Sequence, residues 1–171
     1  MKKRLAMLVL AGAMVTSSLT GCGLKDSATV ATVAGDEIPA GLANFYARMT
    51  QAQYESMYSS YLGDNMWTTE ASEGKTYEKL VKDEVLKDLE NMYLLEDHMD
   101  DYKISLSDDE KKAIKDAAKE FSKDNDKDDK EKVSGDTEYV ERYLTLVTIK
   151  QKMTDAIEAE ADTNVTDDEA K

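Results

Sequence analysis

Apolar residues recur at steps of three and four along four stretches of this chain, which is the period of an amphipathic helix. The first stretch runs from Ala40 to Leu62 and the second, with a continuous apolar stripe, from Tyr77 to Met99. The third opens at Ser107, and the fourth runs from Thr137 to Ala161. The pattern predicts a mainly α-helical fold built on four helices.

Local signals mark the start of these helices. Glu110 follows Ser107 by three residues, the spacing of a capping box in which each side chain bonds the other residue's backbone N–H. Pro39 precedes the first helix, where a missing N–H costs nothing. Ahead of it, apolar residues of the segment Val30 to Ile38 stand on both sides of a Gly35-Asp36 turn signal. This pattern predicts a short N-terminal β-strand or hairpin.

Two polar segments separate the helices. A connector extends from Gly63 to Gly74, and a second segment from Ser122 to Asp136 is dominated by charged residues. The second segment has too little apolar content to pack, so we expect a solvated, mobile loop there.

The same charged segment partly matches a calcium-binding loop. Its sixth position, where the chain must turn sharply, is Asp129 and not Gly, and its twelfth, a bidentate Glu in working sites, is Gly135. We therefore expect weak cation screening and no metal site, although the first three ligand positions are filled by Asp124, Asp126 and Asp128.

No residue is nominated as a catalytic group. His98 is the only histidine, and both a Ser-His-Asp arrangement and a zinc site need further partners. We expect it to stabilise the end of the second helix. The eight glycines form no phosphate-binding loop, and no cofactor is predicted. The carboxylates of the second helix, interleaved with lysines, indicate ordinary surface charge; they are Glu78, Asp83, Glu84, Asp88 and Glu90.

The N-terminus has the organisation of a secretory signal. Basic residues 2–4 precede the apolar run Leu5–Val15, which is too short to span a bilayer. Leu19-Thr20-Gly21-Cys22 follows and resembles the lipobox of bacterial lipoproteins. We expect residues 1–21 to be a signal peptide, Cys22 to be a lipidated N-terminus, and residues 22–28 to be a tether on the extracytoplasmic face of the cell membrane. An ordinary secreted protein or an N-terminal anchor helix is the alternative.

The charge is strongly acidic. The formal net charge is −14, and removal of the three basic residues in 1–21 leaves 19 Lys and Arg against 36 acids, a net of −17. Such a balance argues against nucleic-acid binding and against electrostatic adhesion to anionic lipid. Membrane attachment is therefore expected through acyl chains on Cys22.

Aromatic residues and methionine are concentrated between Phe45 and Trp67. Core or subunit packing, including a possible homodimer, is the simpler interpretation. The alternative is a surface that binds many apolar partners, since flexible Met and flat rings suit such surfaces. The client-binding candidates are Tyr54, Met57, Tyr58, Tyr61, Met66 and Trp67.

The order of these features is familiar: a lipobox, VATVAGDEI, GKTYEKLVKDEVLKDLENMYLLEDH, ISLSDDEKKAI and NVTDDEAK. It resembles the N-terminal chaperone domain of PrsA/SurA-type extracytoplasmic foldases. The resemblance implies a four-helix SurA-N-like domain over residues 29–162 that holds unfolded or partly folded secreted polypeptides. In that family a parvulin prolyl isomerase domain follows, so residues 163–171 are expected to start a missing or truncated segment, and isomerase activity is not assigned to this chain.

The sequence therefore predicts one of two functions. The first is a membrane-anchored chaperone-like domain. The alternative is a structural or interaction lipoprotein with one specific partner and no general affinity for unfolded chains. An enzyme ranks third.

Overall fold

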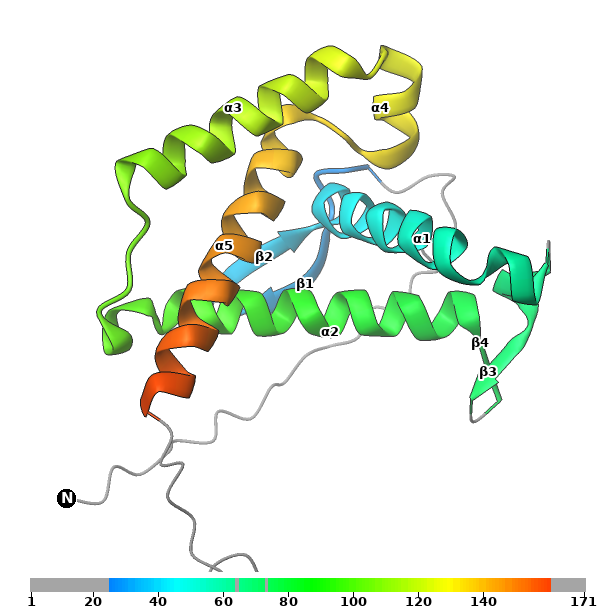
Figure 1. Cartoon of the computed structure of the whole chain (residues 1–171), viewed down its shortest axis with the longest axis horizontal. Coiled ribbons are helices and arrows are strands. Elements are labelled where there is room, and N and C mark those ends of the chain that lie inside the picture. The colour runs from blue at the N-terminus through cyan, green and yellow to red at the C-terminus, as the bar shows by residue number, and fades with distance from the viewer. Residues whose placement is uncertain (1–24, 64, 73, 161–171) are drawn as a thin grey trace, which may run out of the picture.

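The computed structural model describes residues 25–63, 65–72 and 74–160 (Figure 1). The fold is mainly helical, as predicted. The predicted signal peptide, Cys22 and the final segment 163–171 lie outside the described residues. In chain order the elements are β1 Thr29–Val33, β2 Asp36–Pro39, α1 Ala40–Leu62, the 3-10 turn η1 Met66–Thr68, β3 Glu70–Ser72, β4 Lys75–Thr76, α2 Tyr77–Asp97, the 3-10 turn η2 Met99–Tyr102, α3 Asp108–Asp124, α4 Lys127–Val133 and α5 Thr137–Glu160.

The predicted N-terminal hairpin is present. β1 and β2 pair antiparallel, with Val33 opposite Asp36 and Ala31 opposite Ile38. The turn between them has positive φ at Ala34 (53°) and Gly35 (99°), the backbone of a tight hairpin whose twist matches that of its strands. The inward side chains of this hairpin supply Val33 and Ile38 to the main core.

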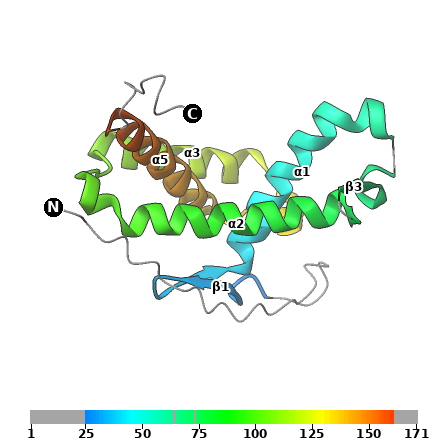
Figure 2. The ribbon, with the colours of Figure 1, turned by 90° about the horizontal axis from the view of Figure 1, so that it is seen from below.

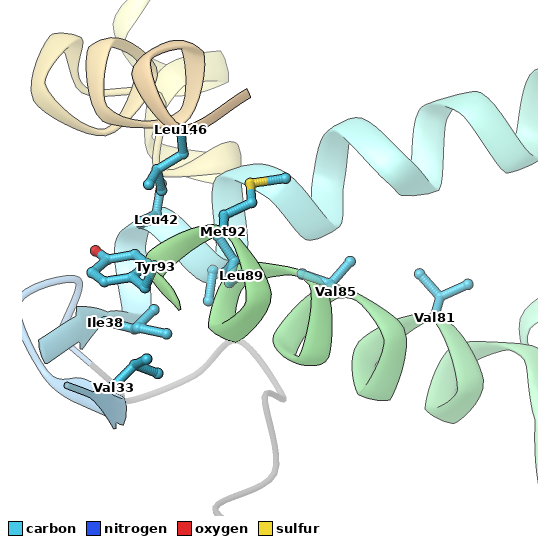
Figure 3. Close-up of a cluster of buried hydrophobic side chains, with 10 residues drawn as sticks. Val33, Ile38, Leu42, Val81, Val85, Leu89, Met92, Tyr93 and Leu146 are labelled. Carbon is cyan, nitrogen blue, oxygen red and sulfur yellow. The ribbon is translucent and has the colours of Figure 1, made fainter. Parts of the chain in front are cut away.

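The main core lies where α1, α2, α5 and this hairpin meet (Figure 3). Leu42 of α1, Leu89 of α2 and Leu146 of α5 are each fully buried. Burial of a side chain of this kind contributes roughly 1.5–3 kcal/mol. The apolar stripe predicted for the second helix is therefore the face that packs, with Val81, Val85, Leu89, Met92 and Tyr93 buried.

Two ionic contacts join helices around this core. Arg142 of α5 donates two parallel hydrogen bonds of 2.6 Å to Glu96 of α2, and its guanidinium lies 4.6 Å from the centre of the Tyr93 ring. Asp88 of α2 accepts hydrogen bonds of 2.6 Å from the Tyr46 hydroxyl and from Lys150 Nζ. The prediction that Asp88 is ordinary surface charge is therefore wrong, because it binds α1 and α5 together.

The third helix begins as predicted. Ser107 Oγ accepts from the Glu110 N–H at 3.2 Å, and Glu110 Oε2 accepts from the Ser107 N–H at 2.7 Å. Ile114 and Ala118 are buried, and a second cluster forms around Phe45, Ala118 and Val140. Ala113 and Ala117 of the same helix are exposed.

The prediction of a solvated loop over 122–136 is wrong. α3 continues to Asp124, and Asp126 caps the additional helix α4 by accepting from the Asp129 N–H at 2.9 Å. Lys130 Nζ donates to the Ser122 carbonyl and hydroxyl at 3.1 Å, which folds α4 back on α3. The described residues thus contain five α-helices, not the four expected for a SurA-N-like domain.

Two further segments differ from expectation. The polar connector 63–74 contains η1 and part of a second antiparallel hairpin, β3–β4, which was not predicted. Residues Lys25–Ala28, predicted as tether, belong to the fold: the Gly41 N–H donates to the Asp26 carbonyl at 2.8 Å and the Ala40 N–H to the Ala28 carbonyl at 2.7 Å.

Candidate functional site

The candidate site lies at the C-terminal end of α1. Figure 2 shows α1 and α2 diverging toward this end, where η1 and the β3–β4 hairpin connect them. The helix ends at Leu62, and Gly63 follows with φ of 66°, a left-handed conformation that glycine adopts without strain. The buried hydrophobic side chains that the structure describes in α1 all lie between Ala40 and Phe45, so the last turns of the helix extend past the three-helix core.

Three of the six predicted client-binding residues face inward. Met66 of η1 is only 2% exposed, so it belongs to the interior and not to a binding surface. Tyr54 and Trp67 are half-buried, pack against the main core, and have ring centroids 6.3 Å apart. These three residues therefore pack in or against the core, as the simpler interpretation predicted.

Polar contacts fix this inner layer. Trp67 Nε1 donates to Glu55 Oε1 at 2.8 Å, and Gln51 Nε2 donates to the same oxygen at 2.8 Å. The hydrogen bond from Gln51, followed by that from Trp67, lowers the pKa of Glu55. Burial, followed by the negative charge of Glu84, raises the pKa of Tyr54, whose hydroxyl lies 3.4 Å from Glu84 Oε2. The layer is therefore held by two carboxylates, Glu55 on the Trp67 ring and Glu84 beside the Tyr54 hydroxyl.

The other three candidates face solvent. Met57 is 54% exposed, Tyr58 40% and Tyr61 86%. Tyr58 rests its ring against that of Tyr54, with centroids 5.6 Å apart, whereas Tyr61 is nearly free of neighbours. We call Met57, Tyr58 and Tyr61 the tip surface. Large apolar side chains gathered on the last turns of one helix are a feature of interaction sites.

Two shallow hollows are also present. One lies between α1 and α2 and is lined by Tyr46, Thr50, Glu84, Val85, Lys87, Asp88 and Asn91. The other lies between the β1–β2 hairpin, α2 and α5, and includes Asp36, Glu37, Tyr93, Glu138 and Glu141. In the first, burial, followed by the hydrogen bond to Asp88, raises the pKa of Tyr46, so this phenol stays protonated at neutral pH. A phenol that donates to Asp88 between two helices suits a structural contact and not proton transfer.

The other residues considered for chemistry have structural positions. His98 follows the last residue of α2, and its Nδ1 lies 2.9 Å from Asp101 Oδ2. Asp126 is the cap of α4. Within the described part of the chain, no group of three or more His, Cys, Asp and Glu side chains is arranged to hold a metal ion.

Comparison with known proteins adds no identification. No protein-family model, no curated protein and no solved structure matches this chain. Among the described residues, none of the helices combines the length and apolar content needed to cross a membrane.

Proposed function

We propose that this chain is a lipid-anchored, extracytoplasmic domain that holds incompletely folded secreted polypeptides, as its resemblance to PrsA/SurA-type N-terminal domains implies. The tip surface is the observation that supports this function best. It presents one flexible methionine and two aromatic rings, with Tyr61 86% exposed, at the end of a helix. Unfolded chains offer apolar groups in no fixed arrangement, and adaptable side chains of this type accept them.

Chemistry that would support an enzyme is weaker. The histidine is a helix-terminal residue with an aspartate neighbour, and the most perturbed tyrosine, Tyr46, is fixed between helices. A holding function needs only apolar surface on a stable scaffold, and the domain supplies both. Lipid on Cys22 would keep this surface at the site where secreted proteins emerge.

The proposal is tested by suppression of aggregation. The full chain with Cys22→Ser, M57S, Y58S and Y61S should lose suppression of an unfolded secreted protein relative to the Cys22→Ser chain. Because all three tip residues are exposed, the free energy of unfolding should change by less than about 0.5 kcal/mol per site. A control variant replaces three other exposed apolar residues with Ser: Met49 (45%), Val147 (37%) and Ile157 (40%).

Equal loss in the tip and control variants would show that general hydrophobicity, and not the tip surface, binds the client. No suppression by the parent chain, if its circular dichroism shows it folded, would contradict the holding function. Stoichiometric capture of a single partner, with no binding to several unrelated unfolded proteins, would establish the alternative function of a dedicated interaction lipoprotein. Sedimentation of the parent chain shows whether the tip surface instead mediates a homodimer.

A further inference from the structure

The methionines in the described part of the chain differ sharply in exposure. Three are at most 2% exposed: Met66, Met92 and Met153. Met99 of η2 is half-buried, whereas Met49 and Met57, both on α1, are exposed. An oxidant in solution therefore reaches the sulfur atoms of Met49 and Met57 far more easily than those of the core.

Met57 lies within the apolar stripe that forms the tip surface. Along α1 it follows Tyr54 by three residues and precedes Tyr61 by four, so the three side chains share one side of the helix. Tyr58 is the next residue, and its ring rests against that of Tyr54. Aromatic side chains thus flank Met57 in both directions along the helix.

Met49 has different surroundings on the same helix. The residues three and four positions after it are Ala52 and Gln53, which are exposed and carry no aromatic ring. Met49 precedes Met57 by eight residues, which is about 12 Å along the helix axis. It is therefore an exposed methionine outside the tip surface, and it supplies an internal control for the chemistry of Met57.

Oxidation by a peroxide changes the polarity of such a side chain. A lone pair of the thioether sulfur attacks one oxygen of hydrogen peroxide, the O–O bond breaks, and proton transfer to the departing oxygen releases water. Sulfur is oxidised by two electrons, the peroxide is reduced, and the product is a sulfoxide. The sulfoxide is polar, and methionine sulfoxide reductases return it to the thioether.

The free domain tolerates a sulfoxide at Met57, because this exposed side chain leaves the new oxygen hydrated. Client binding does not tolerate it equally well. An apolar client segment removes water from the tip surface, and a polar group that loses its water without gaining a hydrogen-bond partner is costly. Oxidation of Met57 therefore acts on binding and not on folding.

We propose that Met57 is a reversible oxidation site that regulates the tip surface. In the thioether state the surface binds incompletely folded polypeptides, and in the sulfoxide state it releases them. The proposal rests on the holding function proposed above. Burial of Met66, Met92 and Met153 makes the response selective, since peroxide converts the exposed methionines while the core stays intact.

The test uses the full chain with Cys22→Ser, which removes the only thiol that competes for the oxidant. M57L keeps an apolar side chain of similar volume that peroxide does not oxidise, and M49L is the matched control. All three chains share the methionines of residues 1–21, so oxidation there contributes equally. After treatment with hydrogen peroxide and its removal, peptide mapping by mass spectrometry should show Met49 and Met57 converted before the three buried methionines.

Binding is measured by fluorescence anisotropy of labelled α-lactalbumin that has been reduced and alkylated, so that it stays unfolded. Peroxide should weaken binding by the parent and by M49L about tenfold, the scale expected for one desolvated polar group without a partner. M57L should bind equally well before and after treatment. Methionine sulfoxide reductases A and B, which act on the two sulfoxide epimers, should restore binding by the parent. The urea midpoint of each chain should stay constant.

Three results would overturn the regulation by Met57. They are a loss in treated M57L as large as in the parent, unchanged binding by a parent chain whose Met57 is fully oxidised, and oxidation of Met57 no faster than that of Met92. An untreated parent that binds no unfolded chain would contradict the holding function and the regulation together. Binding that survives oxidation of Met57 would reject the regulation alone.

Discussion

Tyr46→Phe is expected to destabilise the domain by about 1.5 kcal/mol without changing its fold. The Tyr46 hydroxyl and Lys150 Nζ each donate a 2.6 Å hydrogen bond to the Asp88 carboxylate, so one carboxylate joins α1, α2 and α5. Hydrogen bonds to charged groups contribute roughly 1.5–3 kcal/mol. The lower end applies here because Asp88 borders an open hollow, where water can replace the hydroxyl, and keeps Lys150 as a partner.

Urea unfolding followed by circular dichroism measures this loss, which should lower the midpoint at constant slope. Tyr58→Phe is the control, since the Tyr58 hydroxyl has no hydrogen-bond partner among the described residues, and it should change stability by less than about 0.5 kcal/mol. Adding Lys150→Gln to Tyr46→Phe should cost roughly 1 kcal/mol more than the two single losses combined, because Asp88 then loses both partners. Equal losses of unfolding free energy in Tyr46→Phe and Tyr58→Phe would refute the role of Asp88 in joining α1, α2 and α5.

The same site makes a prediction at alkaline pH. Burial, followed by the hydrogen bond to Asp88, raises the pKa of Tyr46 above its ordinary value of 10.0. A raised folded-state pKa gives a stability contribution that is complete below pH 10 and is lost as the pH rises further. Tyr46→Phe should therefore show a shallower loss of stability above pH 10 than the parent chain.

Two further predictions concern the close packing of Gly41 against the N-terminal segment and the N-terminal cap of α3. Gly41→Ala should lower stability by about 1–3 kcal/mol in thermal unfolding, because the new Cβ would overlap the Tyr139 ring and lie 2.9 Å from Asp26 Cβ; an unchanged Tm would contradict that close approach. Hydrogen bonds from Lys152, then Ser107, lower the pKa of Glu110 to about 2 from an ordinary 4.5. Its stabilisation is present above pH 4.5 and lost as pH falls toward 2, so Glu110→Gln should flatten acid unfolding in that window.

The helices that could be predicted are those whose signals are local. The period of apolar residues predicted α1 at its observed bounds and the start of α5 at Thr137, and the spacing of Ser107 and Glu110 predicted the cap of α3. In contrast, α4 lies in a highly charged segment with no apolar period. It forms because Asp126 caps it and because Lys130 and Ser134 find partners on α3 and on the N-terminal segment, contacts that sequence spacing does not reveal.

The sequence predicts which residues belong to the candidate site but not which of them are exposed. Of the six aromatic and methionine residues that the sequence predicts to bind clients, Met66 is 2% exposed and Tyr61 86%. Helical period applies up to Leu62, whereas the turn at Gly63 redirects the chain and decides that Met66 points inward. The sequence shows the concentration of aromatic and methionine residues between Phe45 and Trp67. It does not show which of them are buried and which are exposed.

By itself, the sequence determined the helical class, the hairpin, the main helix boundaries and the acidic total, because these depend on neighbours within one or two turns. Only the tertiary structure decided that Asp88 and Glu96 bind helices together and that the tip surface is left uncovered. Those properties depend on which helix faces meet across the fold. Neither the net charge nor the local period of apolar residues contains that information.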